Sequence, residues 1–589
     1  MEHAAPQAWL LLALWLWPLL LMALAMRTQW RWLPALGALP ALVSAALLPV
    51  GTQLSLPWLL LGTELELDSI GRVFVLFSAL LWLIAGIFVA TLMYREPIGS
   101  PSGSNHFAQR RFNALFLLAM SGQFWALVGV DLVSFYVGFA IMGLAAYGLI
   151  LAYGDPAARR AGRLYLALTV AGEVALFAGL VSLAAHSGTL TPDPSLLAAA
   201  GGPSLALILL GLGVKAAIVP LHLWLPVTYT AAPIPATAVL SSAMIKVAVL
   251  GWLRWLPLGA VTWPHWALAL SIIGLLSAFY ALLIGLIQRD PKAVLAYSSI
   301  SKMGFLLLLT GLMLGQPDLL GAGITAMLFY ATHHALTKAG LFLGLGLYEQ
   351  NTHQRRTQQL LLAGLIFLAL ALAAAPLTSG AAAKYLSKPL LQAAPWHWLS
   401  PLLWLMTLTT ILLMARFLWL LRFPASKAGW EGTAAHPTES SAHFELNLLA
   451  PFLAWGLLLA LIAALPWLFA PASFWPTNSA NLLLALALCA LVLILSKRGR
   501  NPLATLIGRI APGDILGPLE RSAQRLRTQA GRFQPGQRST RSTESTRSTD
   551  PTSASETALE LKLRGWPVAG ALWLGLGMLL LLLLLAGAR

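Results

Sequence analysis

The chain has 589 residues, of which 58% are hydrophobic and only 10% are charged. Soluble domains carry charge on roughly a quarter of their residues, so this composition excludes a water-soluble globule and indicates a membrane protein. The formal net charge of +16 does not indicate nucleic-acid binding, because Lys and Arg lie in short loops between apolar runs. The single cysteine, Cys489, lies within an apolar run, which excludes a disulfide framework and a thiolate metal cluster.

Apolar stretches of about 20 residues, enough for a helix to cross the bilayer, recur along almost the whole chain. The first stretch has no basic leader and is followed by Arg27 and Arg31, which favours a retained helix over a cleaved signal peptide. The sequence therefore predicts an all-α polytopic membrane protein with about 14–16 transmembrane helices. The expected spans are 7–26, 29–50, 70–93, 112–130, 132–153, 163–187, 203–228, 233–256, 265–287, 292–315, 318–348, 359–385, 398–422, 445–470, 479–496 and 567–588.

The distribution of basic residues between the loops predicts the orientation of these helices. Loops that follow odd-numbered predicted helices are basic, as in Arg159–Arg160 and Lys497–Arg500, whereas loops that follow even-numbered helices carry acidic residues. Short basic loops mark the cytoplasmic side, so we expect the N-terminus outside a bacterial inner (plasma) membrane. Arg254 and Lys388, near helix ends, are the exceptions to this pattern.

The composition of the chain becomes more polar and more basic after the fifteenth predicted helix. Residues 502–530 mix apolar and basic positions around prolines and a glycine, which is typical of a broken interfacial amphipathic segment. The basic low-complexity stretch from Arg538 onward is expected to be disordered. The predicted divisions are 1–111 for helices 1–3, 112–256 and 265–422 for two five-helix repeats, 445–496 for helices 14–15, 497–566 for the interfacial and basic linker, and 567–589 for the last helix.

Ionisable side chains inside the apolar runs are costly at bilayer depth, so each requires an explanation. They are Glu173, Lys215, His222, Lys246, Lys302, His333, His334, Lys338, Lys384 and Arg416. Only one is a carboxylate. A desolvated lysine can release its proton near neutral pH whereas an arginine effectively cannot, so this row of Lys and His favours a proton relay.

Two of the predicted helices also contain internal breaks beside a lysine. Pro220 and a second proline follow Lys215, and Pro376 and a glycine precede Lys384. Interrupted helices in corresponding positions of two halves indicate a transporter built from inverted repeats, with sites near the middle of the membrane. The carbonyl groups freed at such breaks can hold water or a cation.

These residues occur in motifs that resemble the antiporter-like subunits shared by respiratory complex I, Mrp-type cation/proton antiporters and membrane-bound hydrogenases. The similarity covers roughly residues 70–420. Its motifs are Asp131-Leu-Val-Ser-Phe-Tyr-Val-Gly138, Lys215 with Pro220-Leu-His222-Leu-Trp224-Leu-Pro226, Pro233-Ile-Pro235, Asp290-Pro-Lys292 with Leu295-Ala-Tyr-Ser-Ser299, and His334-Ala-Leu-Thr-Lys338 with Leu341-Phe-Leu.

The resemblance implies two inverted five-helix repeats with broken helices, and roles for individual residues. Lys215 and Lys384 match the broken-helix lysines of the two half-channels, and His334 with Lys338 matches a relay pair. Lys246 resembles a helix-eight lysine, and Lys302 stands where a His or Gln is more usual. The expected proton relay comprises Glu173, Lys215, His222, Lys246, Lys302, His334, Lys338 and Lys384, with the lysines used in sequence order. For His333 we expect a structural role, and for Arg416 a topological one.

The fifth predicted helix departs from the family pattern. There the family has a Glu that pairs with the broken-helix lysine, but here residues 137–140 read Val-Gly-Phe-Ala and the acid is absent. Glu173 matches an acidic position in the next helix. We hypothesise that Glu173 is the charged partner of Lys215 instead; the alternative is a degenerate first half-channel.

Enzyme motifs are absent from the sequence: it has no phosphate-binding glycine loop, cysteine cluster or nucleophile elbow. We therefore predict no catalytic residue, cofactor or metal of its own, and any redox chemistry would belong to partner subunits. The expected partners are other membrane subunits, protons, the lipid bilayer and, in one alternative, Na⁺ or K⁺. Three functions remain open: a proton-translocating subunit of a complex I-like pump, a subunit of a Na⁺(K⁺)/H⁺ antiporter, and the proton-channel partner of a solute uptake system.

Overall fold

The computed structural model describes residues 6–93, 102–199, 201–351, 354–393, 399–422 and 444–469, and the isolated residues 483, 487 and 512. All of them belong to one compact unit, which ends at Glu520. The predicted spans 479–496 and 567–588 and the linker 497–566 lie outside the described residues, apart from those three isolated positions.

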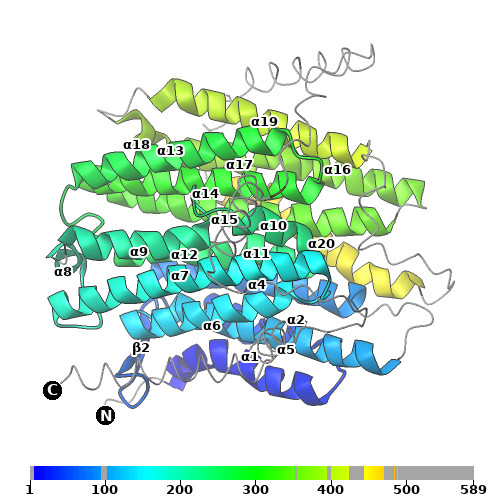
Figure 1. Cartoon of the computed structure of the whole chain (residues 1–589), viewed down its shortest axis with the longest axis horizontal. Helices are drawn as coiled ribbons and strands as arrows, with labels where there is room; N and C mark the ends of the chain where they lie inside the picture. The colour runs from blue at the N-terminus through cyan, green and yellow to red at the C-terminus, as the bar shows by residue number, and fades with distance from the viewer. Residues whose placement is uncertain are drawn as a thin grey trace, which may run out of the picture. The chain divides into compact units, whose positions relative to one another are not determined.

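Helices form nearly all of the described chain and run side by side across the view in Figure 1. In the first half they are α1 Leu10–Arg27, α2 Leu33–Leu36, α3 Leu39–Leu47, α4 Ser69–Leu92, α5 Ser102–Val128, α6 Leu132–Ile150, α7 Pro156–Ser187, α8 Pro194–Ala199, α9 Gly201–Ala216, α10 Trp224–Ala231, α11 Ile234–Ser241 and α12 Val247–Trp255. In the second half they are α13 Pro264–Leu286, α14 Pro291–Gly315, α15 Leu320–Gln350, α16 Arg355–Leu372, α17 Ser379–Leu386, α18 Lys388–Gln392, α19 Ser400–Arg422 and α20 Phe444–Phe469. Short 3-10 turns cover Pro6–Trp9 (η1), Met244–Lys246 (η2) and Pro317–Leu319 (η3).

Within the described residues, 11 helical segments are long and apolar enough to cross a membrane. They confirm the predicted class of helical membrane protein. The hydropathic part of α14 is wholly buried, and α14 packs against α13, α15 and α19. This helix therefore forms the centre of the second half of the chain, and its polar residues face other helices rather than lipid.

One predicted span, 29–50, is wrong as a single helix. The segment forms the two short helices α2 and α3, with Gly37 between them and Pro40 in the first turn of α3. Proline has no backbone N–H to continue a helix from the preceding turn. The two short helices pack against α4, where Gly86 lies so close to Ala35 that an added Cβ would come within 2.5 Å of its backbone.

A β-hairpin follows α3, and the apolar-run analysis did not anticipate it. Strands β1 Thr52–Leu56 and β2 Thr63–Leu67 pair antiparallel, and alternate residues of each strand are buried. The hairpin contacts the start of α6, where Asp131 caps the helix by accepting from Val133 N at 3.0 Å and Ser134 N at 2.8 Å. The second carboxylate oxygen of Asp131 accepts from Glu64 N of β2 at 2.9 Å.

Arg254, an exception to the basic-loop pattern, has a structural role in the fold. Its guanidinium donates to Asp68 Oδ1 at 2.9 Å and to Gly129 O at 3.1 Å, and its side chain is 7% exposed. Asp68 also caps α4 by accepting from Gly71 N at 2.6 Å. The ion pair therefore connects the end of α12 to the beginning of α4. This structural role explains why a basic residue occurs at a helix end where the neighbouring loops carry acidic residues.

We expect Arg254→Ala to destabilise the protein by about 2 kcal/mol, because it removes a largely buried donor and leaves the Asp68 carboxylate without its cation. The thermal unfolding midpoint of the detergent-solubilised chain measures this effect. Arg254→Lys keeps the charge but not the planar donor pair, and should fall between the two. A midpoint for Arg254→Ala equal to that of the wild type would contradict this role.

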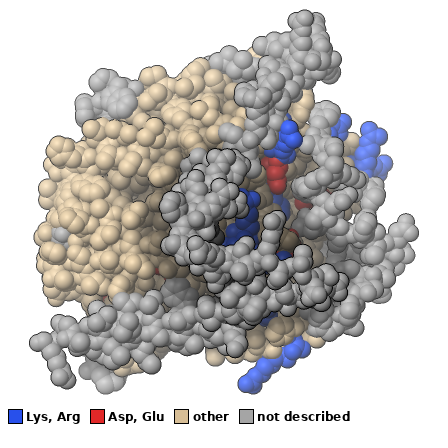
Figure 2. All heavy atoms as spheres, in the orientation of Figure 1, with Lys and Arg blue, Asp and Glu red and all other residues tan. Residues whose placement is uncertain are grey.

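Charged side chains are unevenly distributed over the described surface. Figure 2 shows the visible Lys and Arg side chains in the centre and right of the view, while the left part of this face consists of other residues. Because the helices run across this view, the visible basic residues gather toward one end of the helix bundle. Segregation of this kind accords with helices that cross a membrane in a fixed orientation.

Candidate functional site

The first buried lysine lies at the end of α9, where the helix breaks. After Lys215 the chain leaves the helix, and Ala217 adopts a left-handed backbone with φ of 55° at the start of the non-helical segment 217–223. Lys215 Nζ donates to Tyr165 Oη at 3.4 Å and lies 5.7 Å from the centre of the Phe139 ring. Tyr165 in turn donates to Gly143 O at 2.9 Å. These contacts hold the ammonium toward α6 and α7.

Glu173, the carboxylate of the predicted relay, lies on α7 and is 4% exposed. A Cβ added to Gly143 of α6 would collide with Glu173 Oε1, so a glycine at this position leaves room for the carboxylate. Among the described residues Oε1 has no hydrogen-bond partner, and the charges of Glu173 and Lys215 act on each other. Gly143 follows Ala140 by three residues on the same side of α6. The carboxylate therefore lies about one turn of α6 away from Ala140.

Lys246, His334 and Lys338 form a fully buried central group. Within the part of the chain that is described, Lys246 Nζ and both ring nitrogens of His334 have no hydrogen-bond partner. Lys338, one turn after His334 on α15, donates to Leu295 O of α14 at 2.5 Å and to Ser298 Oγ. Buried polar atoms without a protein partner are usually bonded to ordered water, so the central group has the character of a hydrated polar site.

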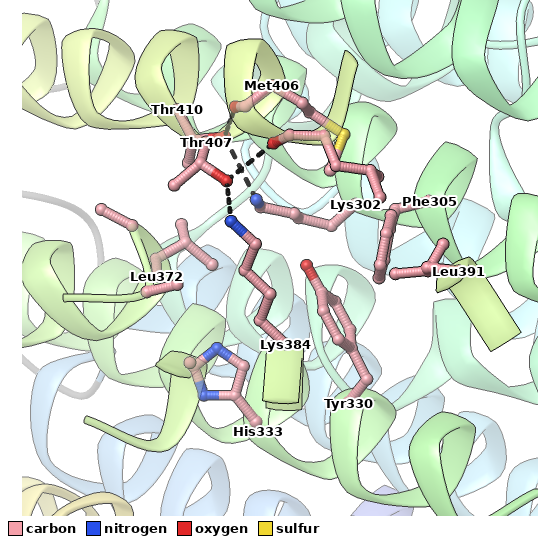
Figure 3. A pocket seen from close by; sticks show the side chains of 14 residues that line it. Lys302, Phe305, Tyr330, His333, Leu372, Lys384, Leu391, Met406, Thr407 and Thr410 are labelled. Atoms are coloured by element: carbon pink, nitrogen blue, oxygen red, sulfur yellow. Dashed lines mark hydrogen bonds between the residues drawn. The ribbon is translucent and has the colours of Figure 1, made fainter. Parts of the chain in front are cut away.

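The second broken helix meets α14 at a small cavity, drawn in Figure 3. Lys302 of α14 and Lys384 of α17 both line it, and their side chains point toward each other below α19. Lys384 Nζ donates to Thr407 Oγ1 at 2.6 Å, and Lys302 Nζ donates to Thr410 Oγ1 at 3.2 Å. The volume open to the centres of water molecules is about 30 Å³, which is room for about two waters.

The spatial order of the lysines differs from their order in the sequence. The turn η2, which ends at Lys246, packs against α9, which carries Lys215. Lys338 is acted on by the charges of both Lys246 and Lys302, and Lys302 by the charge of Lys384. The structural sequence is therefore Lys215, Lys246, Lys338, Lys302, Lys384.

The remaining ionisable residues lie in different surroundings. His222, in the break after α9, is buried with its ring 5.4 Å from Tyr280 of α13. His333 lines the cavity, and its Nδ1 lies 2.8 Å from Ser379 Oγ at the start of α17. Arg416 donates to Gln288 O at 2.9 Å near the end of α19. Among the described residues, no group of three or more His, Cys, Asp and Glu side chains is arranged to hold a metal ion.

Comparison with known proteins identifies the family. The family described as NADH:quinone oxidoreductase/Mrp antiporter, TM, matches residues 129–413. NADH-quinone oxidoreductase subunit N of Desulforudis audaxviator (strain MP104C) is 30% identical over 375 residues, which are 60% of this chain and 71% of the relative. The chain belongs to this family of antiporter-like membrane subunits. The matched range includes every predicted relay residue, from Glu173 to Lys384.

Further relatives in the family carry different names. Hydrogenase-4 component B of Escherichia coli (strain K12) is 32% identical over 309 residues, or 49% of this chain and 44% of the relative. A probable K(+)/H(+) antiporter subunit of Rhizobium meliloti (strain 1021) is 32% identical over 259 residues, or 42% of this chain and 25% of the relative. The chain thus spans less than half the length of these two relatives.

Solved structures of the family have the same fold. The Mrp complex from Dietzia sp. DQ12-45-1b matches with a TM-score of 0.68 and 22% identity, covering 90% of this chain and 60% of that one. Respiratory complex I from Thermus thermophilus with bound NADH matches with a TM-score of 0.62 and 24% identity, covering 82% of this chain and 99% of that one. At these identities the likeness concerns the fold alone.

Several residues around the lysines were not singled out by sequence reasoning. Tyr165, Thr407 and Thr410 are the hydrogen-bond partners of three of the lysines. Hydroxyl residues in apolar helices usually bond to their own backbone, so nothing in the sequence distinguishes the two threonines from their neighbour Thr409. His333, for which the sequence analysis expects a structural role, lines the cavity of the second half.

Proposed function

We propose that the chain is a proton-translocating membrane subunit of a larger complex, and that protons move along Lys215, Lys246, Lys338, Lys302 and Lys384. One observation carries the proposal: Lys246, Lys302 and Lys338 are buried inside the helix bundle, and Lys302 shares one cavity with the half-buried Lys384. Placing several ammonium groups together away from water costs several kcal/mol for each, so the row of lysines favours a state in which some of them are neutral. Such a row can exchange protons between neighbours.

Glu173 and the two histidines His222 and His334 complete the proposed relay. The charges of Glu173 and Lys215 act on each other. An ionised Glu173 favours the protonated form of Lys215, and a neutral Glu173 allows Lys215 to release its proton. His334 lies beside Lys246 and Lys338, and both act on its charge. His222 lies in the first helix break and connects that break to α13 through Tyr280.

The finer features of the proposal follow from the sequence. The N-terminus is outside a bacterial inner membrane, and other membrane subunits are the partners that supply the driving force. The repeats 112–256 and 265–422 are the two half-channels. This division is supported by one broken helix in each: the break 217–223 after Lys215, and the break 373–378 before Lys384.

A cation/proton antiporter is the second candidate function, favoured by the similarity to the probable K(+)/H(+) antiporter relative. Here proton movement would be driven by exchange with Na⁺ or K⁺. The same lysines would then carry the protons that are exchanged for the cation.

One experiment tests the proposal and separates the two candidates. The intact complex is reconstituted into vesicles, and the internal pH is followed with a dye while NADH, then a Na⁺ or K⁺ gradient, is applied. We expect proton movement in response to one of these drivers. NADH-driven movement without added cations would exclude the antiporter candidate, and cation-driven movement without a response to NADH would favour it. No movement with either driver would contradict proton translocation.

A further inference from the structure

We propose that Thr407 and Thr410 are positioning residues that hold the amines of Lys384 and Lys302 in one cavity, and that cavity water carries the proton between the two lysines. The inference rests on the proposed proton translocation and names the residues that shape one of its steps. In that step the ammonium of one lysine gives a proton to a water molecule, which gives another to the neutral amine of the other lysine. The pair thereby exchanges one proton with no change in total charge.

The two threonines are spaced to match the two lysines. They lie three residues apart on α19, so their side chains emerge from the same side of the helix about one turn apart. Thr407 accepts from Lys384 Nζ at 2.6 Å, and Thr410 accepts from Lys302 Nζ at 3.2 Å. Figure 3 shows both hydroxyls above the cavity, with the lysines reaching them from two other helices. A single turn of α19 therefore fixes the positions of both amines.

The hydrogen of each hydroxyl is already committed to the backbone. Thr407 donates to Leu403 O at 2.9 Å, and Thr410 donates to Met406 O at 2.7 Å. A hydroxyl has one hydrogen to donate and two lone pairs to accept with. Each threonine can consequently only accept from its lysine, and it can do so whether the amine is charged or neutral, since both forms carry N–H groups.

This arrangement leaves the proton-accepting position of each amine for the cavity. A neutral amine bonds its threonine through an N–H, so the bond to the threonine does not occupy the lone pair of the amine. The cavity has room for about two waters between residues that include both lysines. Water in this space can take the proton from one amine and supply the other, whereas either threonine would first have to break its backbone bond.

The test compares three substitutions at each threonine in the reconstituted intact complex. Serine keeps the accepting oxygen, alanine removes it but leaves space for a water molecule, and valine removes it and fills the space. We expect the rate of proton movement to fall in the order Ser, Ala, Val. The valine variants should be about tenfold slower than wild type, the factor expected for loss of one hydrogen bond to a charged group.

Thr409→Val is the matched control. Thr409 lies on the same helix and donates to Leu405 O at 3.0 Å, but it does not line the cavity. Its substitution should leave the rate close to wild type while reproducing any general effect of a valine on α19. The amount of assembled protein in the membrane is measured for every variant, so a loss of folding is separated from a loss of rate.

The outcomes distinguish the inference from the proposed function. If Lys302→Met and Lys384→Met stop proton movement but Thr407→Val and Thr410→Val do not slow it, the positioning role is wrong and translocation stands. If the valine variants lose all movement, as the methionine variants do, the hydroxyls are carriers rather than anchors, and the inference is also overturned. If neither methionine variant affects transport, the proposed function fails for this cavity.

Discussion

Replacing Glu173 with glutamine is expected to reduce proton movement by at least about a hundredfold, the lower end of the range for loss of a group that gives and takes a proton. Among the described residues, Glu173 is the only carboxylate that acts on the charge of Lys215. Glutamine has nearly the same size and fits beside Gly143, but it remains neutral at every pH. Lys215 would then lack a partner whose charge could change during a transport cycle.

A second substitution can restore what Glu173→Gln removes. Ala140 lies on α6 one turn before Gly143, in the segment 137–140 where the resemblance leads us to expect an acid. We expect Ala140→Glu in the Glu173→Gln background to recover a substantial part of the rate, measured as acidification of vesicles that contain the intact complex. Glu66→Gln in the exposed part of the hairpin is the control for loss of a carboxylate elsewhere. Unchanged transport in Glu173→Gln would exclude this residue from the relay.

Substitution of Lys384 by methionine should have the largest effect in the second half of the chain. Methionine retains most of the length of the side chain but cannot carry a proton, and it leaves Lys302 as the one amine in the cavity. We expect a loss of proton movement of at least about a hundredfold, because Lys302 then has no second amine with which to exchange a proton there. The initial rate of pH change in reconstituted vesicles measures it.

Lys388→Met is the matched control for this prediction. Lys388 lies one turn after Lys384, at the start of α18, and its Nζ is 5.1 Å from the centre of the Tyr385 ring. It does not line the cavity. Lys388 acts on Lys384 only through its charge and cannot take part in exchange within the cavity, so Lys388→Met should slow transport much less than Lys384→Met. An equal loss in both variants would show that positive charge in this region matters in general, and that Lys384 has no specific role.

The positions of the lysines were predictable from the sequence because each is a charged residue within an otherwise apolar run. Lys215 and Lys384 were also recognisable as lying beside helix breaks, since proline and glycine interrupt the pattern within one or two turns, and both breaks are present in the structure. Their order in space was not predictable. Lys338 comes between Lys246 and Lys302 because α15 packs against both α11 and α14. The hydropathy of a single sequence does not show which helices pack against each other.

Features that depend on contacts between distant segments were missed for a similar reason. The hairpin Thr52–Leu67 lies within a region too short and too polar for a span, and its alternating pattern is brief. The role of Thr407 becomes visible only when Lys384 reaches it from another helix. Glu173 is the intermediate case: its family match was readable in the sequence, but the room for its carboxylate depends on Gly143 of a neighbouring helix.

The lining of the cavity below α19 has a consequence for ion selectivity. Its charged groups are Lys302 and Lys384, and no carboxylate is among the described residues that line it. Sodium and potassium ions need several oxygen ligands and are repelled by a neighbouring ammonium, whereas a proton is passed from one molecule to the next without an ion ever occupying the space. This cavity is therefore a poor site for alkali metal ions. If the complete complex exchanges such ions for protons, they must cross the membrane by a route that bypasses this cavity.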